Sequence, residues 1–197
     1  FTTCTDIEPP KIEHYPSQDN VSYDQTYSVL AVVTDQWGTV GSVELKYTGV
    51  DGANYSVEMA VTYADTYLAA IPAQMALGTL YYYIEAADAY GNTARSPTNY
   101  TNRSQLHSVD VVDDVKPEIS HVQVMEAAVF WDIGIWAAVT DGIQLQNATL
   151  NYMSVGASVF VGLPMTANAS GNTFEATIPA QTATGQVNRY FLESLPA

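Results

Sequence analysis

Six asparagines carry the most specific spacing in the sequence, because each stands two positions before a serine or threonine with no proline between. The six are Asn20, Asn54, Asn99, Asn102, Asn147 and Asn168. This triplet is the acceptor pattern for N-linked glycosylation. Serine and threonine make up about a sixth of the chain, so chance alone would give only about two such triplets. We therefore expect a secreted chain that carries N-linked glycans at turns and strand ends.

A second group of residues that could do chemistry is acidic. Asp110, Asp113 and Asp114 gather near the middle of the chain, and Asp141 ends an expected strand that could reach the same place. Calcium ions prefer carboxylate and carbonyl oxygens, so these four aspartates are candidate Ca²⁺ ligands. The alternative is a solvated acidic linker, and the spacing is not that of an EF-hand. Asp35 and Asp88 are expected instead to cap turns through their own backbone.

Catalytic patterns are absent from the sequence. His14, His107 and His121 fall on expected strands without metal-ligand spacing, so we interpret them as packing or surface residues. The chain has no Gly-x-Ser-x-Gly, His-Glu-x-x-His or phosphate-loop motif. A glycosidase-type carboxylate pair has no fixed spacing and stays the one catalytic alternative. We predict that the protein is not an enzyme and has no catalytic residues.

Aromatic residues suggest one candidate contact. Trp37 is expected in a loop that follows a strand, where it could touch a sugar or a neighbouring subunit. The run Tyr81-Tyr82-Tyr83 is expected to place alternate rings on opposite faces of a strand, mainly in a core.

Charge and cysteine content exclude several classes of partner. The net charge is −15 and only six residues are Lys or Arg, so no basic patch can form for nucleic acid or an anionic membrane. No run of 18 apolar residues exists that could insert into a bilayer. The single cysteine, Cys4, excludes an internal disulfide and a cysteine metal site. Cys4 could pair between chains, carry a modification or have no role.

An internal repeat organises the elements that must position these residues. Thr66–Asn92 predicts a strand, a bend, a long strand Leu80–Ala87 and a turn, and Thr173–Ser194 follows the same pattern. Ile71-Pro72-Ala73-Gln74 recurs as Ile178-Pro179-Ala180-Gln181, about 107 residues later. Apolar side chains on both faces of Leu80–Ala87 indicate a central strand.

Further strand pairs support an all-β fold of two tandem sandwiches. The two repeats open at Pro10-Lys11-Ile12 and Pro117-Glu118-Ile119. The further expected strands, in matching pairs, are Tyr27–Asp35 and Ile135–Asp141, Val43–Tyr47 and Ala148–Tyr152, and Tyr55–Val61 and Val159–Met165, and the last pair is expected to cross toward the second sheet. Together with the opening strand and the two strands of Thr66–Asn92, Gln105–Val112 makes seven strands in the first repeat. Seven strands in about 100 residues are typical of immunoglobulin-like or fibronectin-III-like sandwiches. We predict a lead-in at 1–9, a sandwich at 10–112, a linker at 113–116 and a second sandwich at 117–197.

The second sandwich lacks its last strand within this chain. Its long strand reaches Ala197, with no counterpart of the Asp88–Asn92 turn or of Gln105–Val112. An open sandwich edge exposes unpaired backbone groups and apolar side chains. We therefore expect either that the protein continues past Ala197 or that another chain supplies the strand.

The pattern Val-Thr-Asp, Leu-x-Tyr, Ile-Pro-Ala and Gly-x-x-Tyr-Tyr-Tyr-Ile-x-Ala-x-Asp-x-x-Gly-Asn resembles the tandem immunoglobulin-like or fibronectin-III-like repeats of archaeal and bacterial cell-surface proteins. The second copy keeps only the first half of the pattern. The resemblance implies an extracellular or cell-surface location and a structural role in a surface layer or extracellular filament, with copies of itself or neighbouring surface proteins as partners. An adhesin or carbohydrate-binding spacer in a longer chain is the alternative.

Overall fold

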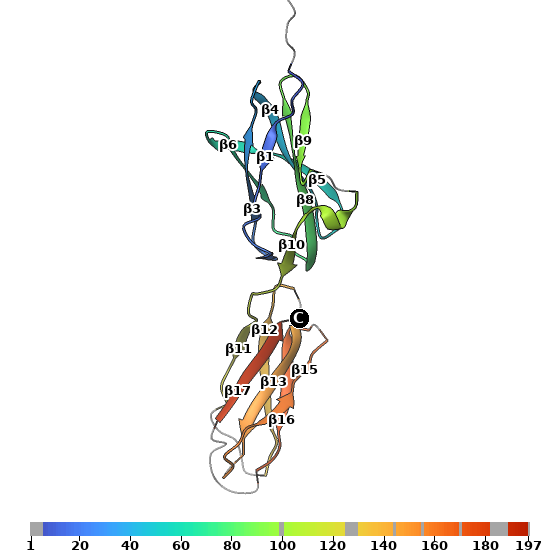
Figure 1. Ribbon diagram of the computed structural model, residues 1–197. Coiled ribbons are helices and arrows are strands. Elements are labelled where there is room, and N and C mark those ends of the chain that lie inside the picture. Colours follow the sequence, from blue (N-terminus) through green and yellow to red (C-terminus); the bar gives the residue numbers. More distant parts are fainter. Residues whose placement is uncertain are drawn as a thin grey trace, which may run out of the picture. The chain divides into compact units, whose positions relative to one another are not determined.

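A computed structural model of the chain describes residues 6–98, 101–124, 130–143, 145–154, 156–169, 171–181 and 189–196 (Figure 1). The chain divides into two compact units, Phe1–Val112 (unit 1) and Asp113–Ala197 (unit 2). Both are built from β-strands, and the helix found in the described residues is one short 3₁₀ turn. No described helix is long and apolar enough to cross a membrane.

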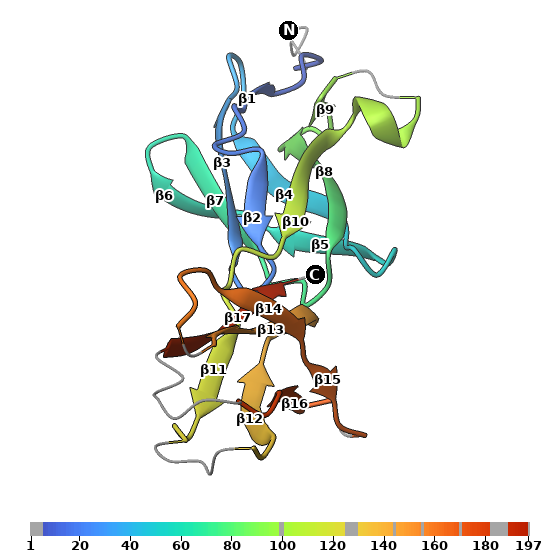
Figure 2. The same ribbon diagram turned by 90° about the horizontal axis from the view of Figure 1, so that it is seen from below.

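Unit 1 is a sandwich of two β-sheets. Its elements are β1 (Lys11–Glu13), β2 (Asn20–Ser22), β3 (Tyr27–Thr34), β4 (Val40–Thr48), β5 (Asn54–Glu58), β6 (Ala60–Tyr63), β7 (Thr66–Ile71), β8 (Gly78–Asp88), β9 (Thr93–Ser96), the 3₁₀ helix η1 (Arg103–Gln105) and β10 (His107–Val112). One sheet has the order β1-β3-β7-β6, and the other has the order β2-β10-β8-β4-β5, with β9 also on β8. The pairing of β2 with β10 is parallel and can be followed in Figure 2. This is the strand arrangement of an immunoglobulin-like sandwich.

Alternating burial explains why the two sheets pack face to face. In β3 every second residue, from Tyr27 to Val33, is buried and the residues between are exposed. In β8 Tyr82 and Ile84 are among the inward residues that are completely buried. Because successive side chains of a strand point to opposite faces, each sheet presents one apolar face to the other. β8 lies between β4 and β10, which confirms the prediction of a central strand.

The segment expected as one strand, Tyr55–Val61, is two strands on different sheets. β5 pairs with β4, and β6 pairs with β7 in the opposite sheet. Between them Met59 is buried, and its backbone N–H donates to the carbonyl of Val43 at 2.8 Å. The prediction that this segment crosses between the sheets is confirmed, and the prediction of a single strand is wrong.

The described part of unit 1 contains more strands than the seven predicted. One reason is that two separate strands, β10 and β9, pair with the same edge of β8. β10 pairs with the first half of β8, and β9 pairs with its second half. The strand expected to start at Gln105 begins at His107, because residues 103–105 form η1. Asn102 caps this turn by accepting a hydrogen bond from the N–H of Ser104 at 3.1 Å.

Unit 2 repeats the same design with fewer described strands. They are β11 (Glu118–His121), β12 (Ile133–Thr140), β13 (Leu145–Met153), β14 (Val161–Pro164), β15 (Thr166–Ala167), β16 (Thr173–Ile178) and β17 (Arg189–Pro196). The sheets have the orders β11-β12-β16-β15 and β14-β13-β17. Its core includes the large, fully buried side chains of Ile135, Leu150 and Ile178.

Strand register shows that β13 and β17 correspond to β4 and β8. The register of β4 on β8 shifts between Val40 and Ser42, and that of β13 on β17 shifts between Leu145 and Asn147. Within the described residues β17 has β13 on one edge and no strand on the other. The predicted sandwich lacking its last strand is therefore confirmed for this part of the chain.

Depth of burial predicts which substitutions unfold unit 1. Ile84→Ala should lower its free energy of unfolding by about 3 kcal/mol, because a fully buried side chain leaves a cavity. Leu30→Ala on the exposed face of β3 should cost less than about 1 kcal/mol. Urea unfolding of the full chain measures both. Equal losses would contradict the assignment of the inward face.

Candidate functional site

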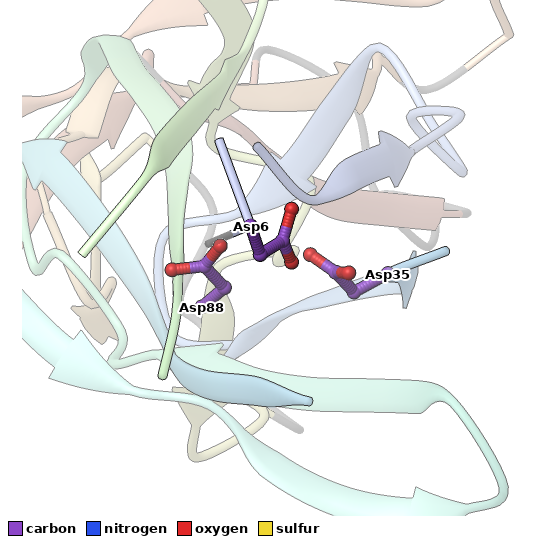
Figure 3. A group of neighbouring side chains, drawn as sticks. All are labelled: Asp6, Asp35 and Asp88. Atoms are coloured by element: carbon purple, nitrogen blue, oxygen red, sulfur yellow. The ribbon is translucent and has the colours of Figure 1, made fainter. Parts of the chain in front are cut away.

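Three carboxylates meet at one end of unit 1. Asp6, Asp35 and Asp88 each place a ligand oxygen within 4.8 Å of the others (Figure 3). Among the described residues this is the one group of three or more histidine, cysteine or acidic side chains so arranged. Asp6 lies in the segment before β1, Asp35 directly follows β3, and Asp88 ends β8. The group, here called the acidic cluster, thus joins the lead-in to a strand of each sheet.

Turn hydrogen bonds hold the side chains of Asp35 and Asp88 in place. Asp35 Oδ1 accepts from the backbone N–H groups of Trp37 at 2.9 Å and Gly38 at 2.7 Å. Asp88 Oδ1 accepts from those of Tyr90 and Asn92, both at 2.8 Å. The predicted turn-capping roles of Asp35 and Asp88 are therefore confirmed. Each cap uses one carboxylate oxygen; the second oxygen of Asp35 has no hydrogen-bond partner, whereas that of Asp88 accepts from the Asn92 side chain.

Asn92 and Gly38 bring Asp6 to the other two aspartates. The side-chain amide of Asn92 donates to Asp88 Oδ2 at 2.7 Å and to the backbone carbonyl of Asp6 at 3.2 Å. Gly38 packs so closely that a Cβ atom there would lie 2.9 Å from Asp6 Oδ2. A larger residue at position 38 would therefore displace the Asp6 carboxylate.

The acidic cluster concentrates negative charge in a poorly solvated place. Asp88 is only 5% exposed. Its burial acts to raise its pKa, but hydrogen bonds from Asn92, Tyr90 and Gly91 outweigh that effect, so the pKa lies below its ordinary value. Asp6 Oδ2 and Asp35 Oδ2 are completely buried and have no hydrogen-bond partner. The ion pairs between described residues all involve other carboxylates. Oxygen atoms in this arrangement are suited to a hard cation.

The four aspartates predicted to bind Ca²⁺ are distributed over both units. Asp110, in β10 of unit 1, accepts a hydrogen bond from Thr79 Oγ1 at 2.8 Å. Asp113, Asp114 and Asp141 belong to unit 2, where the described residues contain no group of three acids like the acidic cluster. The four-residue site stays a prediction.

Sequence reasoning missed Asp6, although the repeat contains a signal for it. Asp6 and Asp35 have counterparts in Asp113 and Asp141, separated from them by about one repeat length. Asp113 Oδ1 and Asp141 Oδ1 also cap turns, accepting from Val115 and Ile143 at 3.1 and 3.2 Å. Their Oδ2 atoms are buried without a partner as well. Aligning the aspartates of the two repeats would have identified Asp6 and Asp35 together.

The histidines pack against strands. His14 contacts the carbonyl of Leu30 through Nδ1 at 2.6 Å and the Tyr82 hydroxyl through Nε2 at 2.9 Å. His121 makes the equivalent contacts with Trp136 and Tyr190 at 2.7 and 2.8 Å. These repeated contacts join the inner faces of the two sheets in each unit. The interpretation of these two histidines as packing residues is confirmed.

His107 extends this arrangement in unit 1. Its ring centroid lies 4.8 Å from that of His14, and its Nε2 is 3.2 Å from Ser96 Oγ. Burial, together with the neighbouring His14, lowers the pKa of His107 to about 4. Burial also lowers the pKa of His14. Both rings are therefore neutral at pH 7.

The glycosylation candidates that the structure describes are all exposed. They are Asn20, Asn54, Asn102, Asn147 and Asn168, while Asn99 lies outside the described residues. Trp37, the candidate contact, is 69% exposed and follows β3. Cys4 also lies outside the described residues. Glycosylation and the contact role of Trp37 stay predictions.

Known proteins resemble this chain in structure only. No family model and no curated protein matches its sequence. Similar solved structures include the tetra-tandem repeat from the extending region of a large adhesion protein, at 13% identity and a TM-score of 0.37, covering 88% of this chain. The match spans 40% of the length of that adhesion-protein structure.

A titin fragment is also similar, at 10% identity and a TM-score of 0.43, with 96% of this chain and 92% of that chain covered. The fibronectin(III)-like modules of Clostridium thermocellum CbhA share 17% identity at a TM-score of 0.35, over 87% of this chain and 78% of theirs. Likenesses at this level do not distinguish between functions.

The lowered pKa of His107 predicts a pH-dependent stability of unit 1. The unfolded chain binds a proton at this histidine below about pH 6.5, whereas the folded unit does so only near pH 4. Because of His107, the free energy of unfolding of unit 1 should be highest above about pH 6.5 and should fall by about 3 kcal/mol as the pH drops to 4.

Urea unfolding between pH 7.5 and 4 measures this fall. His107→Gln should flatten the curve over that range, because glutamine does not titrate. An unchanged pH dependence in the variant would contradict the role given to His107.

Proposed function

We propose that this chain is a secreted, N-glycosylated structural module of a cell-surface assembly, either a surface layer or an extracellular filament. The observation that carries the proposal is the excess of glycosylation triplets, six where about two are expected. The exposure of every described acceptor asparagine supports it, because an oligosaccharide must project into solvent.

Architecture and charge support the same role. Two sandwiches in one chain offer rigid β-surfaces. A net charge of −15 favours a surface that repels copies of itself except where specific contacts or cations intervene. We expect the partners to be copies of this chain or neighbouring surface proteins.

The open edge of β17 suggests how such copies would assemble. Within the described residues this edge carries no strand, although β8 carries β9 and β10 at the corresponding place. Leu192 is only partly buried, whereas its counterpart Ile84 is completely buried. A groove beside β17 is lined partly by Val115, Ile119 and Leu192. An added strand would pair with the edge and cover this apolar surface.

The first residues of another subunit are the candidate donor. The segment Phe1–Tyr15 contains Ile7, which is 76% exposed. Ile12 already pairs with Val33 inside unit 1, so the donating part is restricted to the residues before β1.

A second candidate function is an adhesin or carbohydrate-binding spacer within a longer extracellular protein. The large exposed fraction of the Trp37 side chain favours it, because sugar rings stack on exposed aromatic faces. Soluble monomers that bind a glycan through Trp37 would support this alternative over an assembling module.

Glycosylation can be tested at one site without disturbing the fold. Mass spectrometry of peptides from the protein secreted by its native host should find a glycan on Asn54. Ser56→Ala should remove this glycan, because it destroys the acceptor triplet while leaving Asn54, whose side-chain oxygen accepts from Thr48 Oγ1 at 2.8 Å. Ser28→Ala, an exposed change outside any triplet, serves as the matched control. Unmodified asparagine at all six positions would contradict the proposal.

Strand donation predicts a truncation phenotype. Deleting residues 1–9 should abolish polymers, seen by electron microscopy and light scattering, while unit 1 keeps its β-sheet circular dichroism signal. Polymers that persist after the deletion would exclude this donor.

A further inference from the structure

We propose that Asp6, Asp35 and Asp88 bind one Ca²⁺ ion. The site differs from the predicted set of Asp110, Asp113, Asp114 and Asp141. It does not depend on the proposed surface function, because it is argued only from the geometry of unit 1.

The first argument is the condition of the carboxylate oxygens. Asp6 Oδ2 and Asp35 Oδ2 are completely buried, accept no hydrogen bond and lie in the group that also contains Asp88 (Figure 3). A buried charged oxygen without a partner is unfavourable, and three negative groups this close repel one another. A divalent cation between them removes both costs at once.

The second argument is that the same condition recurs in unit 2. The described residues contain five buried side-chain polar atoms without a partner, and four of them are the Oδ2 atoms of Asp6, Asp35, Asp113 and Asp141. These are the matching residues of the two repeats. Each Oδ1 atom is occupied by a turn N–H group while each Oδ2 atom is left unpartnered. A defect of packing at one place would not repeat in this way.

The donor set favours calcium over other cations. All three side chains offer oxygen only, which excludes ions that prefer sulfur or imidazole. Ca²⁺ accepts irregular sets of carboxylate, carbonyl and water oxygens, whereas Mg²⁺ requires a near-ideal octahedron. Asp35 and Asp88 are partly fixed by their turn hydrogen bonds, so the site is largely formed before the ion arrives. The bound ion would link the lead-in segment to β3 and β8.

The described residues of unit 2 supply counterparts of two of the three carboxylates, Asp113 and Asp141. Asp88 pairs with Val40 at the end of β8, and the corresponding pair in unit 2 is Pro196 with Leu145. A proline at this position of the sequence supplies no carboxylate, and the described residues of unit 2 contain no group of three acids. We therefore expect the stronger site in unit 1.

Differential scanning calorimetry of the full chain at increasing CaCl₂ concentrations tests the proposal directly. Metal-free protein in EDTA-treated buffer is titrated with CaCl₂ up to about 10 mM, which exceeds the dissociation constants of about 0.1–1 mM typical of extracellular modules. The melting temperature of unit 1 should rise by about 5 °C at saturation. TbCl₃ should also show luminescence sensitised by excitation of tryptophan, which CaCl₂ then quenches by competition.

Asp35→Asn is the informative variant. The asparagine Oδ1 still accepts from Trp37 and Gly38, so the turn is kept while one charge is removed. Its apparent affinity for CaCl₂ should fall at least about tenfold. Its melting temperature in EDTA should equal or exceed that of the unmodified chain, because repulsion in the acidic cluster is relieved. A purely structural aspartate would give the opposite result in EDTA.

Asp141→Asn, the same change at the matching cap of unit 2, is the control and should leave the calcium response of unit 1 unchanged. Asp6→Asn is a second variant of the site, in case Asp35→Asn does not fold, and should also weaken binding. A melting temperature that does not respond to 10 mM CaCl₂ would overturn the proposal. Equal responses from Asp35→Asn and Asp141→Asn would overturn it too.

Discussion

The pleat of β3 and β8 is the constraint on which unit 1 depends. Alternate residues of each strand point inward, and the inward positions of β8 from Leu80 to Ala86 are completely buried. Shifting either strand by one residue would turn its apolar set to solvent, so the register is fixed. Because the register is fixed, the residues that follow β3 and end β8 are brought to one end of the sandwich.

That end of unit 1 holds the one group of three acidic side chains found in the described residues. Asp35 and Asp88 begin turns that reverse the chain, and a turn uses only one carboxylate oxygen of each. The second oxygen of Asp35 has no hydrogen-bond partner, and that of Asp88 accepts from Asn92, which also donates to the backbone carbonyl of Asp6. Asp35 thus serves the fold through Oδ1 and is available to a cation through Oδ2. At the inner faces, the contacts of His14 with Tyr82 and of His121 with Tyr190 give both units an equivalent polar link between sheets.

Much of the fold could be predicted from the sequence because alternation and repetition are local signals. The central strand, the crossing segment around Met59 and the missing last strand of unit 2 all follow from them. The short strands β2 and β9 could not be predicted, since β2 has three residues and β9 four. A strand this short is defined by its partner rather than by its own pattern.

The acidic cluster was hidden for a different reason. Asp113 and Asp114 are neighbours in the chain, so their proximity is visible in the sequence. Asp6, Asp35 and Asp88 are far apart in sequence and meet only when the sandwich closes. Turn-capping explained Asp35 and Asp88 adequately, so nothing in either local sequence required a second role. Only comparison of equivalent positions in the two repeats, or the folded structure, brings them together.

The most direct measurement is a crystal structure of the full chain grown in 10 mM CaCl₂, with diffraction data collected at a wavelength where calcium scatters anomalously. The account predicts an anomalous peak in unit 1 at about 2.3–2.6 Å from oxygens of Asp6, Asp35 and Asp88. An acidic cluster without a peak, with its carboxylates sharing a proton or turned to solvent, would contradict it.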